Sequence, residues 1–170
     1  EKTINYIDKC KKLSIPILIF TGNDIDNIIK NKNLIDLKHN GFKGQVNVSP
    51  YLNKDFNSFN VDDKWNDIIK EYPPLNIPFS SNYLPSSSSK VFLFQFLNGI
   101  KLNYPLVYFT QKQDYKVGVF LGEGIWRWRI NEFMNHGNSD VFKKIFQKTK
   151  QLFKVIDKKD RLKILFPSSI

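Results

Sequence analysis

The sequence predicts a three-layer α/β domain with a mixed, mostly parallel central sheet and helices on both faces. The chain opens with an alternation of helix, strand and helix, which is the pattern of α/β proteins. After residue 90, three apolar strand-like runs follow one another closely. A length of 170 residues is enough for one sizeable core, so we expect one domain spanning residues 1–170.

The first helix and strand are predicted from spacing and from one proline. Apolar residues recur at helical spacing from Ile4 to Leu13, and Pro16 ends that helix. Residues 16–20 form an apolar, β-branched run, which indicates a buried strand of the parallel kind. A short helix over residues 25–29 follows, capped by Asn23 or Asp24.

The middle of the chain is mostly polar. Residues 31–60 are rich in Asn and are interrupted by one short predicted strand over residues 45–48. Trp65, Ile68 and Ile69 indicate a helix that ends before Pro73 and Pro74. Residues 76–89 are rich in Ser and Pro, so we expect a loop there.

The sequence after residue 90 predicts strands that pair antiparallel. Strands are expected over residues 91–97, 104–110 and 116–121, and the gaps between them are too short for parallel crossovers. An amphipathic helix opens at Ser139 or Asp140, and residues 162–166 form a final strand.

The composition narrows the classes of function. The net charge of +10 suits nucleic acid or an anionic membrane, but the Lys residues are spread along the whole chain, which favours a solvated basic surface. We therefore expect no specific nucleic-acid partner. One cysteine excludes an internal disulfide framework. No apolar run approaches the ~20 residues of a membrane span, and no signal peptide is visible.

No catalytic residue, metal or cofactor is predicted. Cys10 lies on the apolar stripe of the first helix, where a structural thiol is expected rather than a nucleophile. His39 and His136 lie in polar segments that read as surface loops. Two isolated His and one helical Cys do not supply the three or four ligands of a zinc site.

The most informative segment is Gly122–Arg129, which packs two Trp, two Arg and a Glu between a strand and a helix. Ligand sites in α/β folds lie at such junctions. Glu123 could be a base, bind a cation, or pair with Arg127 or Arg129. Asp24 could contribute to the same ligand site or cap a helix. The candidate ligand or interaction residues are Asp24, Glu123, Trp126, Arg127, Trp128 and Arg129.

The conformation of this segment decides what its aromatic residues do. We expect a helix from Trp126, because Asn131–Met134 continues the pattern, with Trp126, Ile130 and Phe133 as a buried stripe. If the Trp rings were exposed beside the Arg residues instead, they could stack nucleic-acid bases.

Residues 104–106 through the Trp-Arg segment resemble a domain near the C-terminus of large, membrane-anchored Bacteroidetes proteins. These proteins are often labelled von Willebrand factor A domain-containing. Three further stretches are similar to the same family: residues 15–22, residues 72–79 with Pro73-Pro74-Leu75, and residues 151–161.

The resemblance implies a fold like that of class I glutamine amidotransferases, a flavodoxin-like layered sheet flanked by helices. Active members carry a Cys on a glycine-rich elbow and a later His-Pro-Glu, and neither occurs here. The resemblance thus implies the fold without the reaction. It also implies a fragment of a longer chain, with one or more strands before Glu1, and membrane anchoring in the cell envelope only through segments outside this chain.

Three functions follow as hypotheses. The first is a non-catalytic interaction domain of a larger envelope protein, with a protein partner there. The second is a hydrolase of unknown type that uses Glu123 or Asp24. The third is a nucleic-acid-binding module that uses the Trp-Arg segment.

Overall fold

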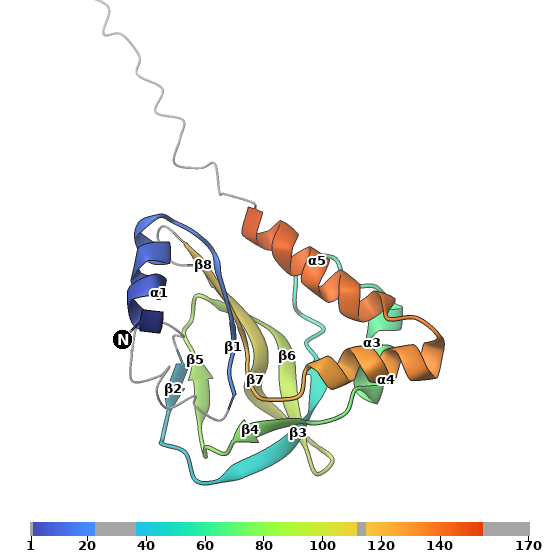
Figure 1. Cartoon of the computed structure of the whole chain (residues 1–170). Helices are drawn as coiled ribbons and strands as arrows, with labels where there is room; N and C mark the ends of the chain where they lie inside the picture. Colours follow the sequence, from blue (N-terminus) through green and yellow to red (C-terminus); the bar gives the residue numbers. More distant parts are fainter. Residues whose placement is uncertain (1, 23–36, 112–114, 155–170) are drawn as a thin grey trace, which may run out of the picture.

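The computed structural model describes residues 2–22, 37–111 and 115–154. Asp24, the predicted helix over residues 25–29 and the predicted strand over residues 162–166 lie outside these ranges. The described chain is an α/β structure built around a curled, mixed sheet (Figure 1).

The main sheet has six strands in the order β1-β8-β7-β6-β3-β4. Their bounds are β1 Ile17–Phe20, β8 Lys116–Phe120, β7 Ile100–Gln111, β6 Ser89–Leu97, β3 Gln45–Leu52 and β4 Leu75–Pro78. A separate antiparallel pair is formed by β2, Leu37–His39, and β5, Tyr83–Pro85.

The predicted mixed sheet is confirmed, but the prediction that it is mostly parallel is wrong. Among the described strands, only β1 and β8 pair in parallel, and the other neighbours in the sheet pair antiparallel. The reason is the length of the connections. Asn98 and Gly99, both with positive φ, join β6 to β7 in a tight hairpin that leaves no room for a crossover.

The parallel strand β1 lies at the edge of the described sheet and not in its middle. The prediction of a buried strand for residues 16–20 is therefore wrong, since only Ile19 is buried and Phe20 is 46% exposed. An apolar run of this length indicates a strand, but the run alone does not show how many neighbours the strand has.

The segment 76–89, predicted to be a loop, includes most of β4 and all of β5. Both are short and include proline, so their local composition is that of a loop. Long-range pairing makes them strands: β4 pairs with β3, and β5 pairs with β2.

Four helices are described: α1 Lys2–Lys12, α3 Asp63–Glu71, α4 Trp126–His136 and α5 Asp140–Lys154. In Figure 1, α1 lies on one side of β1 and β8, and α5 lies on the other. Ile145 and Thr149, which the amphipathic pattern predicts to face the core, are buried in α5, and Val141 is buried with them. The ring of Phe146 stacks on that of Phe120, with ring centroids 5.5 Å apart, which fixes α5 over β8.

Candidate functional site

The predicted site begins at the junction between β8 and α4, where Gly122 has a positive φ of 102°. A Cβ atom at this position would lie 2.5 Å from Cγ2 of Ile77 and 2.8 Å from the carbonyl oxygen of Asn76. Glycine is therefore required both for its backbone conformation and for the close approach of β4.

The ends of β1 and β8 meet at this junction, as parallel neighbours should. The amide of Thr21 donates to the carbonyl of Phe120 at 3.0 Å, and the amide of Gly122 donates to Oγ1 of Thr21 at 2.9 Å. Thr21 is 1% exposed, so its hydroxyl is a fixed part of this link. The predicted convergence of these strand ends is present, although Asp24 itself lies outside the described residues.

Glu123 is held in place by its backbone. Its amide donates to the carbonyl of Asn76 at 2.8 Å, and its carbonyl accepts from the amide of Asn76 at 3.2 Å. The side chain is exposed, and its Oε1 lies 3.0 Å from the position of a Cβ on Gly22. The close approach of the segments that follow β1 and β8 therefore places a carboxylate at the surface rather than in an enclosed pocket.

Trp128 and Arg127 bind the carbonyl groups of two consecutive prolines. Nε1 of Trp128 donates to the carbonyl of Pro73 at 2.9 Å, and Nη2 of Arg127 donates to that of Pro74 at 2.7 Å. Trp128 is 1% exposed, and its ring stacks on Tyr72 at a centroid distance of 5.0 Å. These two members of the predicted site therefore have a structural role.

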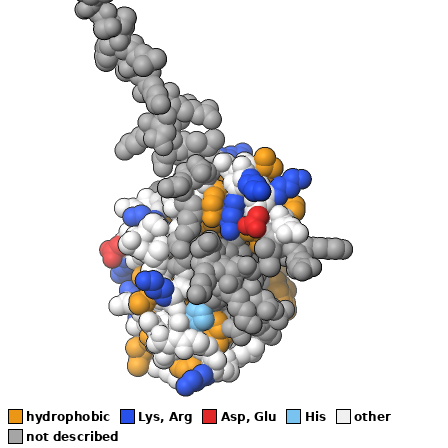
Figure 2. Space-filling model, turned by 90° about the vertical axis from the view of Figure 1, so that its left-hand side faces the viewer, with side chains coloured by type: hydrophobic (Ala, Val, Ile, Leu, Met, Phe, Trp, Pro, Cys, Tyr) orange, Lys and Arg blue, Asp and Glu red, His pale blue; other side chains and the backbone are white. Residues whose placement is uncertain are grey.

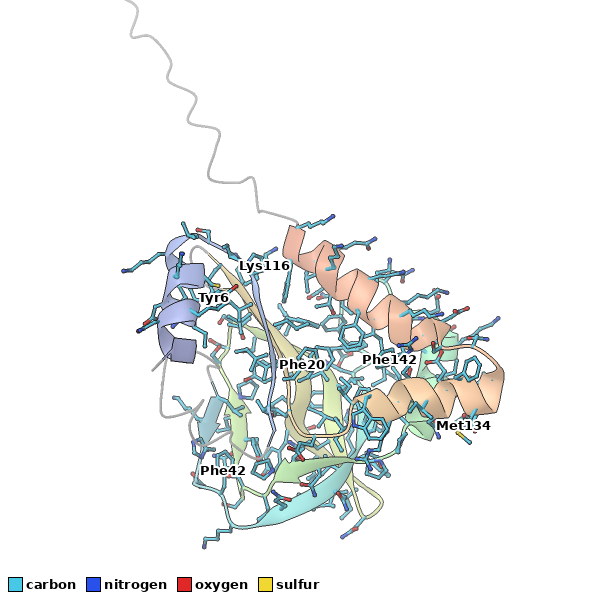
Figure 3. All side chains as sticks on the ribbon, viewed as in Figure 1. Tyr6, Phe20, Phe42, Lys116, Met134 and Phe142 are labelled. Carbon is cyan, nitrogen blue, oxygen red and sulfur yellow. The ribbon has the colours of Figure 1, made fainter. Side chains whose placement is uncertain are left out.

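The apolar stripe of α4 faces outward, which contradicts the prediction that it is buried. The exposed fractions are 63% for Trp126, 50% for Ile130, 60% for Phe133 and 77% for Met134. Figure 3 shows Met134 projecting from α4 on the side away from α5. The predicted helix is confirmed, but it is turned so that Trp128 and Glu132 face inward.

Glu132 is the buried residue that sequence reasoning missed. It is 1% exposed, and its carboxylate accepts the amide protons of Val141 at 2.8 Å and Phe142 at 2.9 Å. Glu132 thus caps the first turn of α5, where the backbone amides lack helical partners. The sequence feature that could have identified Glu132 as buried is its position one turn after Trp128, on the same face of α4.

The hydroxyl of Tyr72 completes this cluster by donating to Oε2 of Glu132 at 2.6 Å. Burial, together with the hydrogen bond to Glu132, raises the pKa of Tyr72 well above its usual value. Tyr72 therefore stays a neutral donor, which is the form that a buried carboxylate needs. The arrangement links α3, α4 and α5.

The sequence predicts both histidines in surface loops, and this prediction is wrong. His39 ends β2, where its Nδ1 accepts from the amide of Gly41 at 3.1 Å. His136 ends α4, and its Nε2 lies 2.8 Å from Oε2 of Glu71. That hydrogen bond, with a second from Asn135, lowers the pKa of Glu71.

Cys10 is buried in α1. Among the residues described, no group of three or more His, Cys, Asp or Glu side chains is arranged to hold a metal ion. Across the same ranges, no helix is both long enough and apolar enough to cross a bilayer.

The geometry divides the four candidate residues of α4 into two sets. Arg127 and Trp128 point toward Pro73 and Pro74 and fix α4. Trp126 and Arg129 are exposed on the outer side of α4, beside Ile130. Such an outward apolar stripe with a flanking cation can contact a partner surface.

Comparisons with known proteins support the fold only. No protein-family model matches the chain, and no curated protein matches it. One solved structure, described as cytoplasmic protein STM3548 from Salmonella typhimurium, is similar with a TM-score of 0.54 and 15% sequence identity. The similarity covers 86% of this chain and 58% of that one, so the chain spans little more than half the length of this structural neighbour.

Proposed function

We propose that this chain is a non-catalytic interaction domain that docks a protein partner through the outer face of α4. The observation that carries the proposal is the outward stripe of Trp126, Ile130, Phe133 and Met134, each at least half exposed. A soluble helix normally turns such a stripe toward the core, and exposed apolar patches mark interaction sites.

The spacing of the stripe is that of a helix recognised by a partner. Its residues stand at positions i, i+4, i+7 and i+8 of α4, so they form one continuous row on the helix surface. A partner helix or groove binds an amphipathic helix through apolar residues at this spacing. The inner face of α4 is held by Trp128 and Glu132, so the stripe cannot turn inward without breaking that packing.

The charge beside the stripe indicates what kind of partner surface would bind it. The Arg129 side chain is exposed beside the stripe, and within the described ranges its guanidinium has no hydrogen-bond or ion-pair partner. A partner carboxylate next to an apolar seam would pair with it. We therefore propose that the occupant is an amphipathic helix of a partner protein, with Asp or Glu beside its apolar positions.

A second copy of this chain fits the stripe poorly. A two-fold contact pairs the same face of both copies, so it would bring the cationic edges of two α4 helices, each with an exposed Arg129, near each other.

A bilayer surface also fits less well than a protein. Exposed carboxylates stand near both ends of α4: Glu123 precedes it, and Glu71 bonds to His136 at its last turn. A uniformly anionic membrane would repel both, whereas a protein can place its charges one by one.

The proposed setting is the cell envelope, in a larger protein that is anchored by segments outside this chain. The support is the resemblance of the Trp-Arg and Pro-Pro-Leu stretches to the envelope family named above. Within the structure, Trp128 and Arg127 contact Pro73 and Pro74 directly, so these two stretches belong to one local unit. The missing elbow Cys and His-Pro-Glu support a domain that does not act as an amidotransferase.

The test uses a synthetic amphipathic helix with Leu at its seam and Glu at the flanking positions. Its matched control carries Lys in place of every Glu. We expect the Glu peptide to bind and to shift the emission of Trp126 to shorter wavelength, while the Lys peptide binds much more weakly. Ile130→Asp should weaken binding at least tenfold. Ile100→Asp, which changes an equally apolar residue that is 63% exposed on the β6–β7 hairpin, should leave it unchanged.

The same experiment also tests a membrane and a second copy of this chain as binding partners for the stripe. Vesicles of phosphatidylglycerol and phosphatidylcholine test the membrane, and sedimentation velocity tests a dimer. Equal binding of both peptides, or a stronger response to vesicles that Ile130→Asp removes, would contradict the proposal.

A further inference from the structure

A cavity of about 480 Å³ lies between the C-terminal half of α5 and the strands β6, β7 and β8. This volume is typical of sites for small molecules. Its apolar lining comes from Phe59, Phe109, Leu152 and Phe153, and the described residues that line it include no Asp or Glu. None of its residues belongs to α4, so this site is independent of the docking face proposed above.

Three lysines from three different strands and helices stand at this cavity: Lys90 from β6, Lys116 from β8 and Lys148 from α5. Nζ of Lys116 donates to the carbonyl of Leu152 at 2.9 Å, which holds it beside the end of α5 (Figure 3). Lys90 and Lys148 have no ion-pair partner among the residues that the structure describes.

Three positive charges line this partly apolar cavity, so a bound anion would be attracted by each of them. The rings of Phe59, Phe109 and Phe153 supply a surface for a hydrophobic body: the centroids are 6.1 Å apart for Phe59 and Phe109, and 6.2 Å for Phe109 and Phe153. A simple inorganic anion would leave this aromatic wall unused. A cation would meet charges of its own sign on the described residues of the lining.

We propose that this cavity binds an amphiphilic anion, with its apolar body against the Phe and Leu side chains and its carboxylate or phosphate head among the three lysines. The head accepts charge-assisted hydrogen bonds from the ammonium groups. The body excludes water from the half-buried rings of Phe59 and Phe153. Carboxylate and phosphate heads can both accept such hydrogen bonds, so the experiment includes one probe with each head group.

The test measures binding of four twelve-carbon probes to the full chain by isothermal titration calorimetry. Dodecanoate and dodecyl phosphate carry the anionic heads, dodecanol is neutral, and dodecyltrimethylammonium is cationic. We expect one anion per chain, with the anions bound at least tenfold more tightly than dodecanol and with no binding of the cation.

The variants separate this site from a general attraction to a protein of net charge +10. Lys90→Gln combined with Lys148→Gln should weaken dodecanoate at least tenfold and leave dodecanol unchanged. Lys64→Gln combined with Lys144→Gln removes the same charge from residues that do not line the cavity, and it should leave dodecanoate unchanged. Leu152→Asp should weaken every probe that binds.

The lysine substitutions change polar side chains, whereas Leu152 is partly buried against the core, so circular dichroism checks the fold of each variant. Equal loss of dodecanoate affinity in the two double-lysine variants would overturn the proposal, because the attraction would then come from net charge. Comparable binding of the cationic probe, or failure of either anion to bind, would overturn it as well.

Discussion

The hydroxyl of Tyr72 and the carboxylate of Glu132 form a 2.6 Å hydrogen bond in the interior, between residues that are 60 positions apart in the chain. The same carboxylate accepts the amides of Val141 and Phe142 at the start of α5. One buried acid therefore joins α3, α4 and α5, and it fixes the orientation that leaves the stripe of α4 outside.

We expect Glu132→Gln to lower the free energy of unfolding by about 2–4 kcal/mol. The amide can accept fewer of the three hydrogen bonds, and it loses the favourable charge at the helix N-terminus. Urea denaturation measures the change. Tyr72→Phe removes only one of the three donors, so its cost should be smaller, about 1–2 kcal/mol. A Glu132→Gln variant as stable as the wild type would show that this carboxylate does not hold the three helices.

The stability should fall in alkaline solution because of Tyr72. Its pKa is raised in the folded protein, so its contribution is fully present below its ordinary pKa of about 10. Above that pH the unfolded chain loses a proton that the folded chain retains. The unfolding free energy should then drop by up to about 1.4 kcal/mol per pH unit from this group. Tyr72→Phe should remove that part of the slope, and an unchanged slope in the variant would contradict the assignment.

Glu71 should titrate below its ordinary pKa of 4.5, chiefly because of the hydrogen bond from His136. The stabilising contribution of a lowered carboxyl pKa is present above the ordinary value and disappears as the pH falls through the folded value. An NMR titration of the Glu71 side chain measures this directly. His136→Ala should move the pKa back toward 4.5, whereas substitution of the exposed Lys143 should not. No movement in His136→Ala would assign the shift to another cause.

Gly122→Ala should destabilise the fold more than an ordinary glycine substitution. Its Cβ would overlap Ile77 and the Asn76 carbonyl, and the positive φ adds strain, so we expect a loss above about 2 kcal/mol. Gly137→Ala is the matched control, because Gly137 also has a positive φ but no atom within 4 Å of the added Cβ. Its expected cost is about 1 kcal/mol. Similar losses in both variants would mean that the approach of β4 is not tight.

Much of the secondary structure could be predicted because local patterns determine it. The helix at Trp65, the strands after residue 90 and the amphipathic helix from Asp140 all follow from periodicity and turn residues. The short strands β4 and β5 could not be predicted, because their evidence is a partner elsewhere in the chain. The position of β1 at the edge of the described sheet could not be predicted for the same reason. The order of strands depends on pairing between distant segments, which no single segment shows.

The candidate site shows the same limit at the level of side chains. The sequence identified the Trp-Arg segment and its helix, but it assigned Trp126 to the interior. The orientation is set instead by Trp128 and Glu132, whose partners Pro73 and Tyr72 lie more than fifty residues away. Helical periodicity shows which residues share a face, and only tertiary contacts decide which face is buried.

Nucleic-acid binding by this chain should be weak and non-specific. On the face shown in Figure 2, the Lys and Arg side chains lie in separate groups and not in one stripe. A net charge of +10 still attracts an oligonucleotide at low salt. We expect this attraction to be lost near physiological salt, because few phosphates are contacted at once.

The sharp test is Trp126→Ala in a salt titration with single-stranded DNA. Trp128 is stacked on Tyr72 and donates to Pro73, so only Trp126 of this segment's two rings is free to stack on a base. We expect Trp126→Ala to bind as the wild type does at every salt concentration, since the attraction comes from scattered charge. A stacked base would instead contribute about 1–3 kcal/mol. Binding that persists at about 0.2 M salt and is lost in Trp126→Ala, with the fold intact by circular dichroism, would assign the outer face of α4 to nucleic acid in place of a protein partner.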